Sequence, residues 1–96
     1  MSAQGLELLE ADEPPTQLAP LLVALWHARR DEWEAAHRIA QDVDDADGSW
    51  VHAYLHRVEG DLSNANYWYR RAGRPECATS LAEEWEEVAH ALLARQ

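Results

Sequence analysis

The chain of 96 residues contains no lysine and no phenylalanine, and it has only one cysteine and four glycines. Because Cys77 is alone, an internal disulfide cannot form, and a single thiol suits the reducing cytoplasm, where we expect the protein to work. The sequence lacks a nucleophile elbow, a glycine-rich phosphate loop and a cysteine-rich metal cluster. The sequence therefore favours a binding protein over an enzyme without deciding between them, and we assign it no cofactor.

Long apolar runs are missing as well. No stretch approaches the roughly 18–20 apolar residues that a membrane-spanning helix needs. Residues 1–13 have neither the basic start nor the apolar segment of a signal peptide. The sequence therefore predicts no membrane partner.

Positive charge is scarce, and all of it is arginine. There are 18 acidic residues against 8 basic ones, which gives a formal net charge of −10. This balance argues against binding to nucleic acid or to anionic lipid, whose phosphates demand the opposite sign. It favours solubility and a basic partner. The arginine and aromatic run at 67–71 does not change this, because its side chains point all round a helix and its arginines complement the helix dipole.

The chain is organised around residues 49–73, which we predict to fold as two antiparallel helices. Apolar residues recur at helical spacing in both halves: Val51, Tyr54, Leu55 and Val58, then Leu62, Ala65, Tyr69 and Ala72. We expect Ser49 to cap the first helix and Gly60 to close it in the left-handed conformation. Asp61 or Ser63 then caps the second helix. A turn this short makes the helices share a core.

The same reasoning predicts an all-α protein of five main helices at 16–30, 31–43, 49–59, 62–73 and 77–95, with no strand. Asp31 and Glu34 have the spacing of a capping box for the second helix. The acidic stretch 42–48 is expected to be a linker that helps to cap the third. We interpret residues 1–15 as a mobile or loosely docked arm and residues 16–96 as one domain.

The central template occurs once more, thirty residues upstream. A shift of thirty superposes Leu25 on Leu55 and Ala35 on Ala65. A period in this range is typical of helical repeat arrays, in which one unit cannot bury its apolar face alone. Two unrelated amphipathic hairpins that look alike are the alternative. In a repeat array, the last helix would cover the apolar face that the second hairpin leaves open.

The residues Gly60, Asp61, Ala65, Tyr69 and Ala72 resemble the second half of a tetratricopeptide or Sel1-type repeat. The first copy departs from this pattern, because Arg30 stands where the turn glycine belongs. The run from 25 to 74 also resembles small all-helical bacterial proteins without an assigned function. The resemblance covers about half of the chain, and it implies a fold more than an activity.

A tetratricopeptide-like arrangement implies a concave groove lined by the first helix of each hairpin. The residues that fall there are Trp50, Tyr54, Arg57 and His27. Aromatic and arginine side chains are frequent in binding hot spots. We therefore expect a small interaction or scaffold module that holds a protein or peptide in this groove, or that joins a copy of itself. A partly buried aromatic belt is the structural alternative.

The second class of function is a metal or small-ligand site at a junction lined by His, Trp and Tyr. His52, His56 and Glu59 lie at i, i+4 and i+7 on one flank of the predicted helix, a spacing that can place imidazoles on one metal ion, and His37 is a further candidate. No fourth ligand is identifiable. The structural interpretation, which we favour at this stage, is that both His52 and His56 are buried and hydrogen-bonded in a contact between the hairpins.

Two repeat units are fewer than the three usually needed to complete a core. Five Trp residues are also hard to cover in a domain of this size. We expect either a homodimer formed through an exposed aromatic face or a bundle closed by residues 16–30 packing against 77–95.

Overall fold

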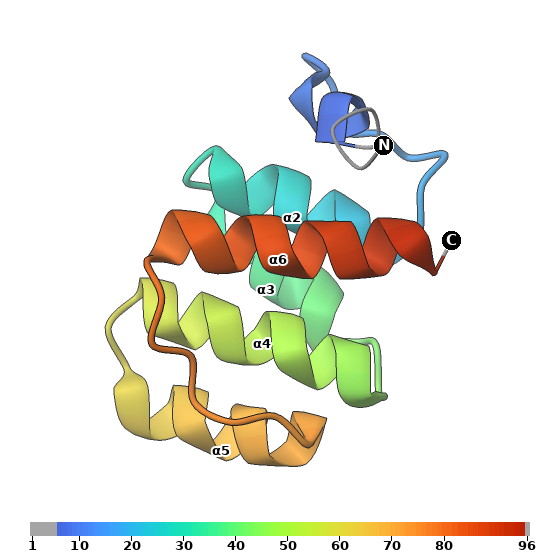
Figure 1. Cartoon of the computed structure of the whole chain (residues 1–96). Coiled ribbons are helices and arrows are strands. Elements are labelled where there is room, and N and C mark those ends of the chain that lie inside the picture. Colours follow the sequence, from blue (N-terminus) through green and yellow to red (C-terminus); the bar gives the residue numbers. More distant parts are fainter. Residues whose placement is uncertain (1–5, 96) are drawn as a thin grey trace.

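The computed structural model describes residues 6–95, which form five α-helices, one short 3-10 helix and no strand. The elements are η1 (Glu7–Glu10), α2 (Pro20–Arg29), α3 (Trp33–Gln41), α4 (Ala46–Val58), α5 (Leu62–Ala72) and α6 (Leu81–Ala94). Helices α2 and α3 form one hairpin, α4 and α5 form a second, and α6 lies along α2 and α4 (Figure 1). The all-α fold class is confirmed. In the described part of the chain, no helix combines the length and the apolarity needed to cross a membrane.

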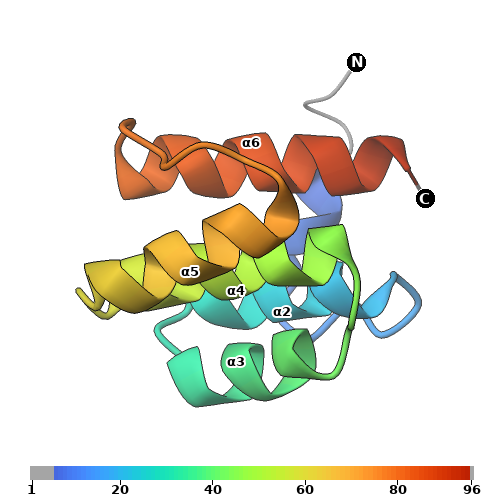
Figure 2. The ribbon, with the colours of Figure 1, turned by 90° about the horizontal axis from the view of Figure 1, so that it is seen from below.

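Helix α4 is the centre of the molecule. All nine residues from 48 to 56 are buried. Helices α2, α3, α5 and α6 all contact α4 and surround it (Figure 2). A helix that is buried on every side is usually apolar all round. This one carries Ser49, His52 and His56 into the interior, so the neighbouring helices have to provide partners for polar groups.

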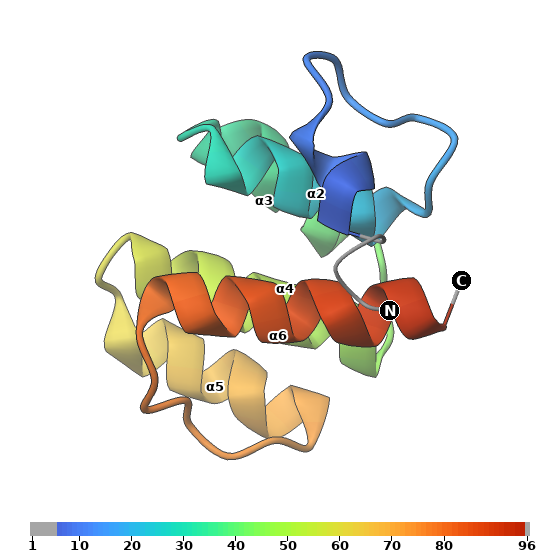
Figure 3. The same ribbon diagram turned by 45° about the horizontal axis from the view of Figure 1, so that its top comes forward.

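Helix α6 closes the bundle by packing on α2 and α4 (Figure 3). Its inner stripe consists of Trp85, Val88, Ala89 and Leu92, all of them buried. The Trp85 indole Nε1–H donates to the carbonyl of Leu25 on α2 at 2.9 Å. The packing of α2 against α6 is the closed bundle that we had expected as one of two arrangements. Each of the five Trp residues is buried or half-buried.

The described part of the N-terminal arm is docked on α2. Leu9 is completely buried, and the indole Nε1–H of Trp26 donates to the carbonyl of Ala11 at 2.9 Å. The Arg30 guanidinium lies over the Trp26 ring and also donates to the carbonyl of Ala11. Residues 1–5 of the predicted arm lie outside the described residues.

Two helices begin four residues later than their sequence patterns predicted. Helix α2 begins at Pro20 and not at residue 16, because a residue before proline avoids the helical region, and Ala19 is extended with ψ 151°. Helix α6 begins at Leu81 and not at residue 77. There Ser80 accepts from the backbone N–H of Glu83, whose side chain accepts from the N–H of Ser80, which makes a complete capping box.

Helix α4 begins three residues earlier than predicted. Its cap is Asp45, whose carboxylate accepts from the N–H of Gly48 at 2.8 Å, and the predicted cap Ser49 lies inside the helix. The acidic linker therefore caps this helix, as expected. Gly48 is required by close packing, because a Cβ at this position would lie 1.9 Å from the carbonyl oxygen of Val43.

The turns of the two hairpins have the same backbone hydrogen bonds. Asp31 and Gly60 each take a left-handed conformation, with φ of 61° and 87°. In both turns this residue bonds to the carbonyl three residues earlier, and the next residue bonds to the carbonyl five residues earlier. This pattern is a Schellman motif. The predicted capping box of Asp31 and Glu34 is therefore wrong, because Asp31 ends the turn of α2 and its side chain does not cap α3.

The turns of the two hairpins correspond at an offset of twenty-nine residues and not thirty. Asp31, and not Arg30, occupies the place of Gly60 in the turn. With this offset the buried Ala36 corresponds to the buried Ala65, whereas a shift of thirty pairs Ala65 with the half-buried Ala35. The turn conformation therefore sets the correspondence between the hairpins. In the predicted hairpin 49–73, the left-handed conformation of Gly60 and the capping of the second helix by Asp61 are confirmed.

We predict that Asp31→Gly stabilises the protein. Glycine adopts a positive φ without the steric penalty that an L side chain has in this region, although it loses more entropy on folding. We expect the free energy of unfolding to rise by about 0.5 kcal/mol. Urea denaturation measures this change. Gly60→Asp is the matched opposite change in the second turn and should lower the stability, so a stabilised Gly60→Asp would contradict this explanation.

Candidate functional site

The predicted groove is filled by helix α6 of the same chain. Trp50 and Tyr54 are buried, and the guanidinium of Arg57 forms an ion pair at 2.8 Å with the carboxylate of Glu84 on α6. Helix α6 thus covers the face of α4 on which the groove was expected, and clefts of about 190, 270 and 330 Å³ remain along its edges beside Trp50, Tyr54 and Arg57. Helix α6 lies there because the first helices of only two hairpins leave apolar surface exposed, and α6 covers this surface. A peptide partner at this position would have to displace α6.

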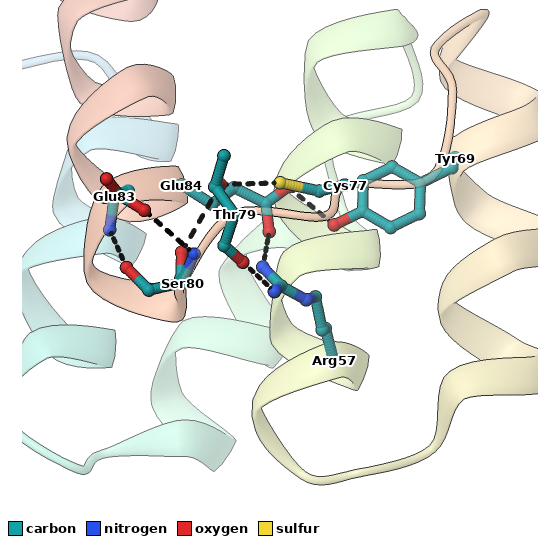
Figure 4. Close-up of polar contacts among 7 residues, drawn as sticks. All are labelled: Arg57, Tyr69, Cys77, Thr79, Ser80, Glu83 and Glu84. Carbon is teal, nitrogen blue, oxygen red and sulfur yellow. Dashed lines mark hydrogen bonds and ion pairs between the residues drawn. The ribbon is translucent and has the colours of Figure 1, made fainter.

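Glu84 is the centre of the polar network under α6 (Figure 4). Its side chain is 1% exposed, and its two oxygens have different partners. One oxygen accepts from Arg57, and the other accepts from the hydroxyl of Tyr69 on α5 at 2.5 Å. Arg57 also donates to the carbonyl of Thr79 in the segment that leads into α6. The buried carboxylate therefore connects α4, α5 and α6.

The charges of this network change the acidity of its neighbours. Burial raises the pKa of Tyr54 to about 12, and the negative charge of Glu84 adds to the increase. Burial, the hydrogen bond to Glu84 and its charge raise the pKa of Tyr69. Burial alone would lower the pKa of Arg57, but the hydrogen bond and charge of Glu84 outweigh it and raise that pKa. At neutral pH both phenols are therefore protonated and Arg57 is charged.

The fourth predicted groove residue, His27, has a different partner. Its Nδ1 lies 2.7 Å from the carboxylate of Glu32, in the turn between α2 and α3, and its ring meets the Trp26 ring edge-on. His27 is therefore paired within its own hairpin. Trp50 has a further contact, because the guanidinium of Arg74 lies 3.3 Å from the centre of its ring.

The four residues predicted for the metal alternative do come together. His37 on α3 and His52 and His56 on α4 each place a ring nitrogen within 4.8 Å of the others. Glu59, one turn beyond His56, joins this group through a hydrogen bond. We call His37, His52 and His56 the three-histidine cluster. It forms where α3 of the first hairpin meets α4 of the second.

Within the cluster, His37 and His52 form a direct hydrogen bond. Their Nε2 atoms are 2.8 Å apart. One of these nitrogens therefore donates a proton and the other accepts it, which two neutral imidazoles achieve and two protonated ones cannot. His52 is 6% exposed, as expected for a buried and hydrogen-bonded histidine.

His56 is held by a carboxylate. Its Nδ1 lies 2.7 Å from Oε2 of Glu59, and the His56 side chain is 8% exposed. Nδ1 therefore carries the proton that is donated to Glu59, and Nε2 keeps its lone pair when the ring is neutral. A carboxylate on one nitrogen of a histidine fixes the ring and directs the other nitrogen toward a ligand.

Two Trp side chains, which the sequence analysis did not assign to this site, form its walls. The ring of Trp33 stacks on His37 with ring centres 4.7 Å apart, and that of Trp68 stacks on His52 at 3.9 Å. The Trp33 indole also donates to the carbonyl of Leu55, which fixes α3 on α4. Trp33 could have been found from its spacing, because it lies one helical turn before His37. Trp68 is on α5, and only the packing of the hairpins brings it to His52.

The surroundings favour the neutral form of two of the imidazoles. Burial lowers the pKa of His52 to about 4, and the neighbouring His37 and His56 contribute in the same direction. Burial and His56 lower the pKa of His37, while the carboxylates of Glu59 and Glu34 act against them. Both rings are therefore uncharged at neutral pH. A neutral imidazole has the lone pair that a metal ion requires.

The cluster has the donor set of a nitrogen metal site. In a tetrahedral zinc site, with metal–nitrogen distances of about 2.0–2.1 Å, neighbouring nitrogens lie roughly 3.3 Å apart. The Nε2 atoms of His37 and His52 are closer than this, so binding requires these rings to separate slightly and one of them to move its proton to Nδ1. No other amino-acid type has to enter the cluster to supply three ligands.

Comparison with known proteins identifies no relative: no protein family matches the chain, and no curated protein or solved structure is significantly similar to it. The resemblance to tetratricopeptide and Sel1 repeats stays a prediction. The chemistry of the site must therefore be argued from its own residues.

We predict that Arg57→Met destabilises the protein by about 3 kcal/mol or more, because it leaves the carboxylate of Glu84 buried without a charged partner. Urea denaturation measures this loss. The double variant Arg57→Met with Glu84→Gln should recover part of it, since the amide removes the charge and still accepts from Tyr69. Arg95→Met is the matched control: it breaks an exposed pair with Asp47 and should lower the stability by less than about 1 kcal/mol. Equal losses in the two arginine variants would contradict the buried-charge explanation.

We predict that acidification destabilises the fold through His52. Its pKa is about 4 in the folded chain, below the unfolded value near 6.5, so between these values the unfolded state binds the extra proton. The contribution is complete above about pH 6.5 and decreases as the pH falls toward 4, by roughly 2–3 kcal/mol in total. His37 acts in the same direction.

The measurement is the free energy of unfolding in urea at about pH 7 and about pH 5. The difference between the two values should shrink in His52→Asn, because asparagine does not titrate. It should remain in His27→Gln, which changes a histidine outside the cluster. An unchanged difference in His52→Asn would show that other groups cause the pH dependence.

Proposed function

We propose that the protein binds a divalent transition-metal ion at the three-histidine cluster between α3 and α4. The single observation that carries this proposal is the convergence of three imidazoles from two helices, with a ring nitrogen of each within 4.8 Å of the others. Imidazole nitrogens prefer zinc, copper, nickel and cobalt, whereas magnesium and calcium prefer oxygen ligands. The fourth coordination position would belong to water or to a small ligand.

Three features around the cluster support binding. Glu59 orients His56 through Nδ1, the arrangement that usually accompanies a metal-bound histidine. The stacking of Trp33 on His37 and of Trp68 on His52 limits the orientations of two rings, so that only their small separation and one proton shift remain when an ion arrives. A preorganised site loses less conformational entropy on binding.

The alternative function, an interaction module with an open groove, has less support. The groove residues Trp50 and Tyr54 are buried, and α6 is held over them by the Arg57–Glu84 pair. We therefore place the binding function on the other side of α4, at the histidines.

The test is binding of Co²⁺ and Zn²⁺ to the purified, metal-stripped protein. We expect one ion per chain by titration calorimetry, and visible absorption bands of tetrahedral Co²⁺ that Zn²⁺ abolishes. His37→Gln, which removes the only ligand on α3, should weaken binding by about tenfold or more. The Trp fluorescence should respond in the same titration, because His52 stacks on Trp68.

His27→Gln and His90→Gln are the matched controls, since these two histidines lie outside the cluster. Both should bind Co²⁺ like the unchanged protein. The proposal fails if the chain binds no stoichiometric metal. It also fails if His37→Gln binds as well as the two controls.

A further inference from the structure

We propose that Glu59 and Asp61, on either side of Gly60, form the entrance through which the metal ion reaches the three-histidine cluster. This inference rests on the proposed function and assigns a role to two carboxylates outside the cluster. His56, Glu59 and Asp61 make a second group whose possible ligand atoms lie within 4.8 Å of one another. His56 belongs to both groups, so the outer group directly adjoins the inner one.

The exposure of these side chains decreases inward. Asp61 is exposed, the Glu59 side chain is 38% exposed, and the His56 side chain is buried. The turn between them opens to solvent, because a Cβ placed on Gly60 would meet nothing within 4 Å. A hydrated cation can therefore reach the carboxylates first and exchange its water for imidazole nitrogens afterwards.

The fold brings the two carboxylates together through the Schellman turn. Glu59 is the C-cap residue of α4, and Asp61 is the N-cap residue of α5, where its carboxylate accepts from the N–H of Asn64. The left-handed Gly60 reverses the chain between them. The first hairpin has Asp31 in place of the glycine and no such pair of carboxylates beside a histidine cluster, so this feature belongs to the second hairpin.

A second approach to the cluster exists on the other side of His37, but its charge is less favourable. A cleft of about 160 Å³ is lined by Trp33, Glu34, His37, Arg38 and Gln41. It has one carboxylate, and the guanidinium of Arg38 repels a divalent cation. The Gly60 turn presents two carboxylates, and we therefore assign the entrance to the turn.

The experiment measures the association rate constant of Ni²⁺ by stopped-flow Trp fluorescence. Ni²⁺ loses its water slowly, so the measured rate is proportional to the fraction of protein that already holds the hydrated ion at its entrance. The variants are Glu59→Gln, Asp61→Asn and the two combined. Glutamine can still accept from His56, and asparagine remains a good helix cap, so both changes remove charge and keep the local structure.

We expect the combined variant to bind Ni²⁺ about tenfold more slowly at low ionic strength, and the difference to shrink as salt is added. Glu34→Gln is the matched control for the cleft and should bind at the rate of the unchanged protein. The dissociation rate, measured with a chelator, separates a loss of entrance from a loss of affinity.

The outcomes distinguish the two proposals. If the unchanged protein shows no saturable fluorescence response to Ni²⁺, the three-histidine site itself is refuted. If it binds Ni²⁺ but the combined variant associates at the same rate, the entrance is refuted and the site stands. A slower rate in Glu34→Gln alone would overturn the inference in favour of the cleft on α3.

Discussion

The burial of α4 on every side is the constraint on which the rest of this small protein depends. A surface helix needs cover on one face only, whereas α4 buries nine consecutive residues, polar ones included. Each direction around α4 must therefore be occupied by another helix, and α2, α3, α5 and α6 all contact it. Residues 6–95 contain no further α-helix, so the helices that complete the core must also provide partners for the polar groups of α4.

The polar groups of α4 fall on two faces. Trp50, Tyr54 and Arg57 lie on one side of the helix, and His52 and His56 lie on roughly the opposite side at 3.6 residues per turn. The first face meets α6, where the buried Glu84 is neutralised by Arg57. The second face meets α3 and α5, where imidazoles bond and stack with one another and with two Trp rings. The buried polar groups are thus paired by an ion pair on one face and by contacts between aromatic rings on the other.

The two faces have different roles: the Glu84 network holds the fold together, whereas the three-histidine cluster carries the proposed function. The Glu84 network is complete, because both carboxylate oxygens have partners and Arg57 is paired, so it stabilises α6 in its position. In the three-histidine cluster, the neutral rings of His37 and His52 hold lone pairs that a cation can use, and a carboxylate orients the His56 ring from outside. A network with satisfied charges excludes a ligand, while a cluster of neutral donors can accept one without first displacing a proton from every ring.

The sequence by itself determined the elements and their pairing. Helical periodicity, Gly60 and the Asp61 cap predicted the central hairpin, because these signals act between residues a few positions apart. The spacing of His52, His56 and Glu59 placed them on one helical flank for the same reason. Helix starts at Pro20, Ala46 and Leu81 were missed where a competing local cap or a proline decided the boundary. Only the tertiary structure decided that α6 covers the predicted groove face, that Trp68 reaches His52, and that the two hairpin turns correspond at an offset of twenty-nine residues. These features depend on contacts between helices distant in the chain and on one left-handed Asp31, which neither periodicity nor composition encodes.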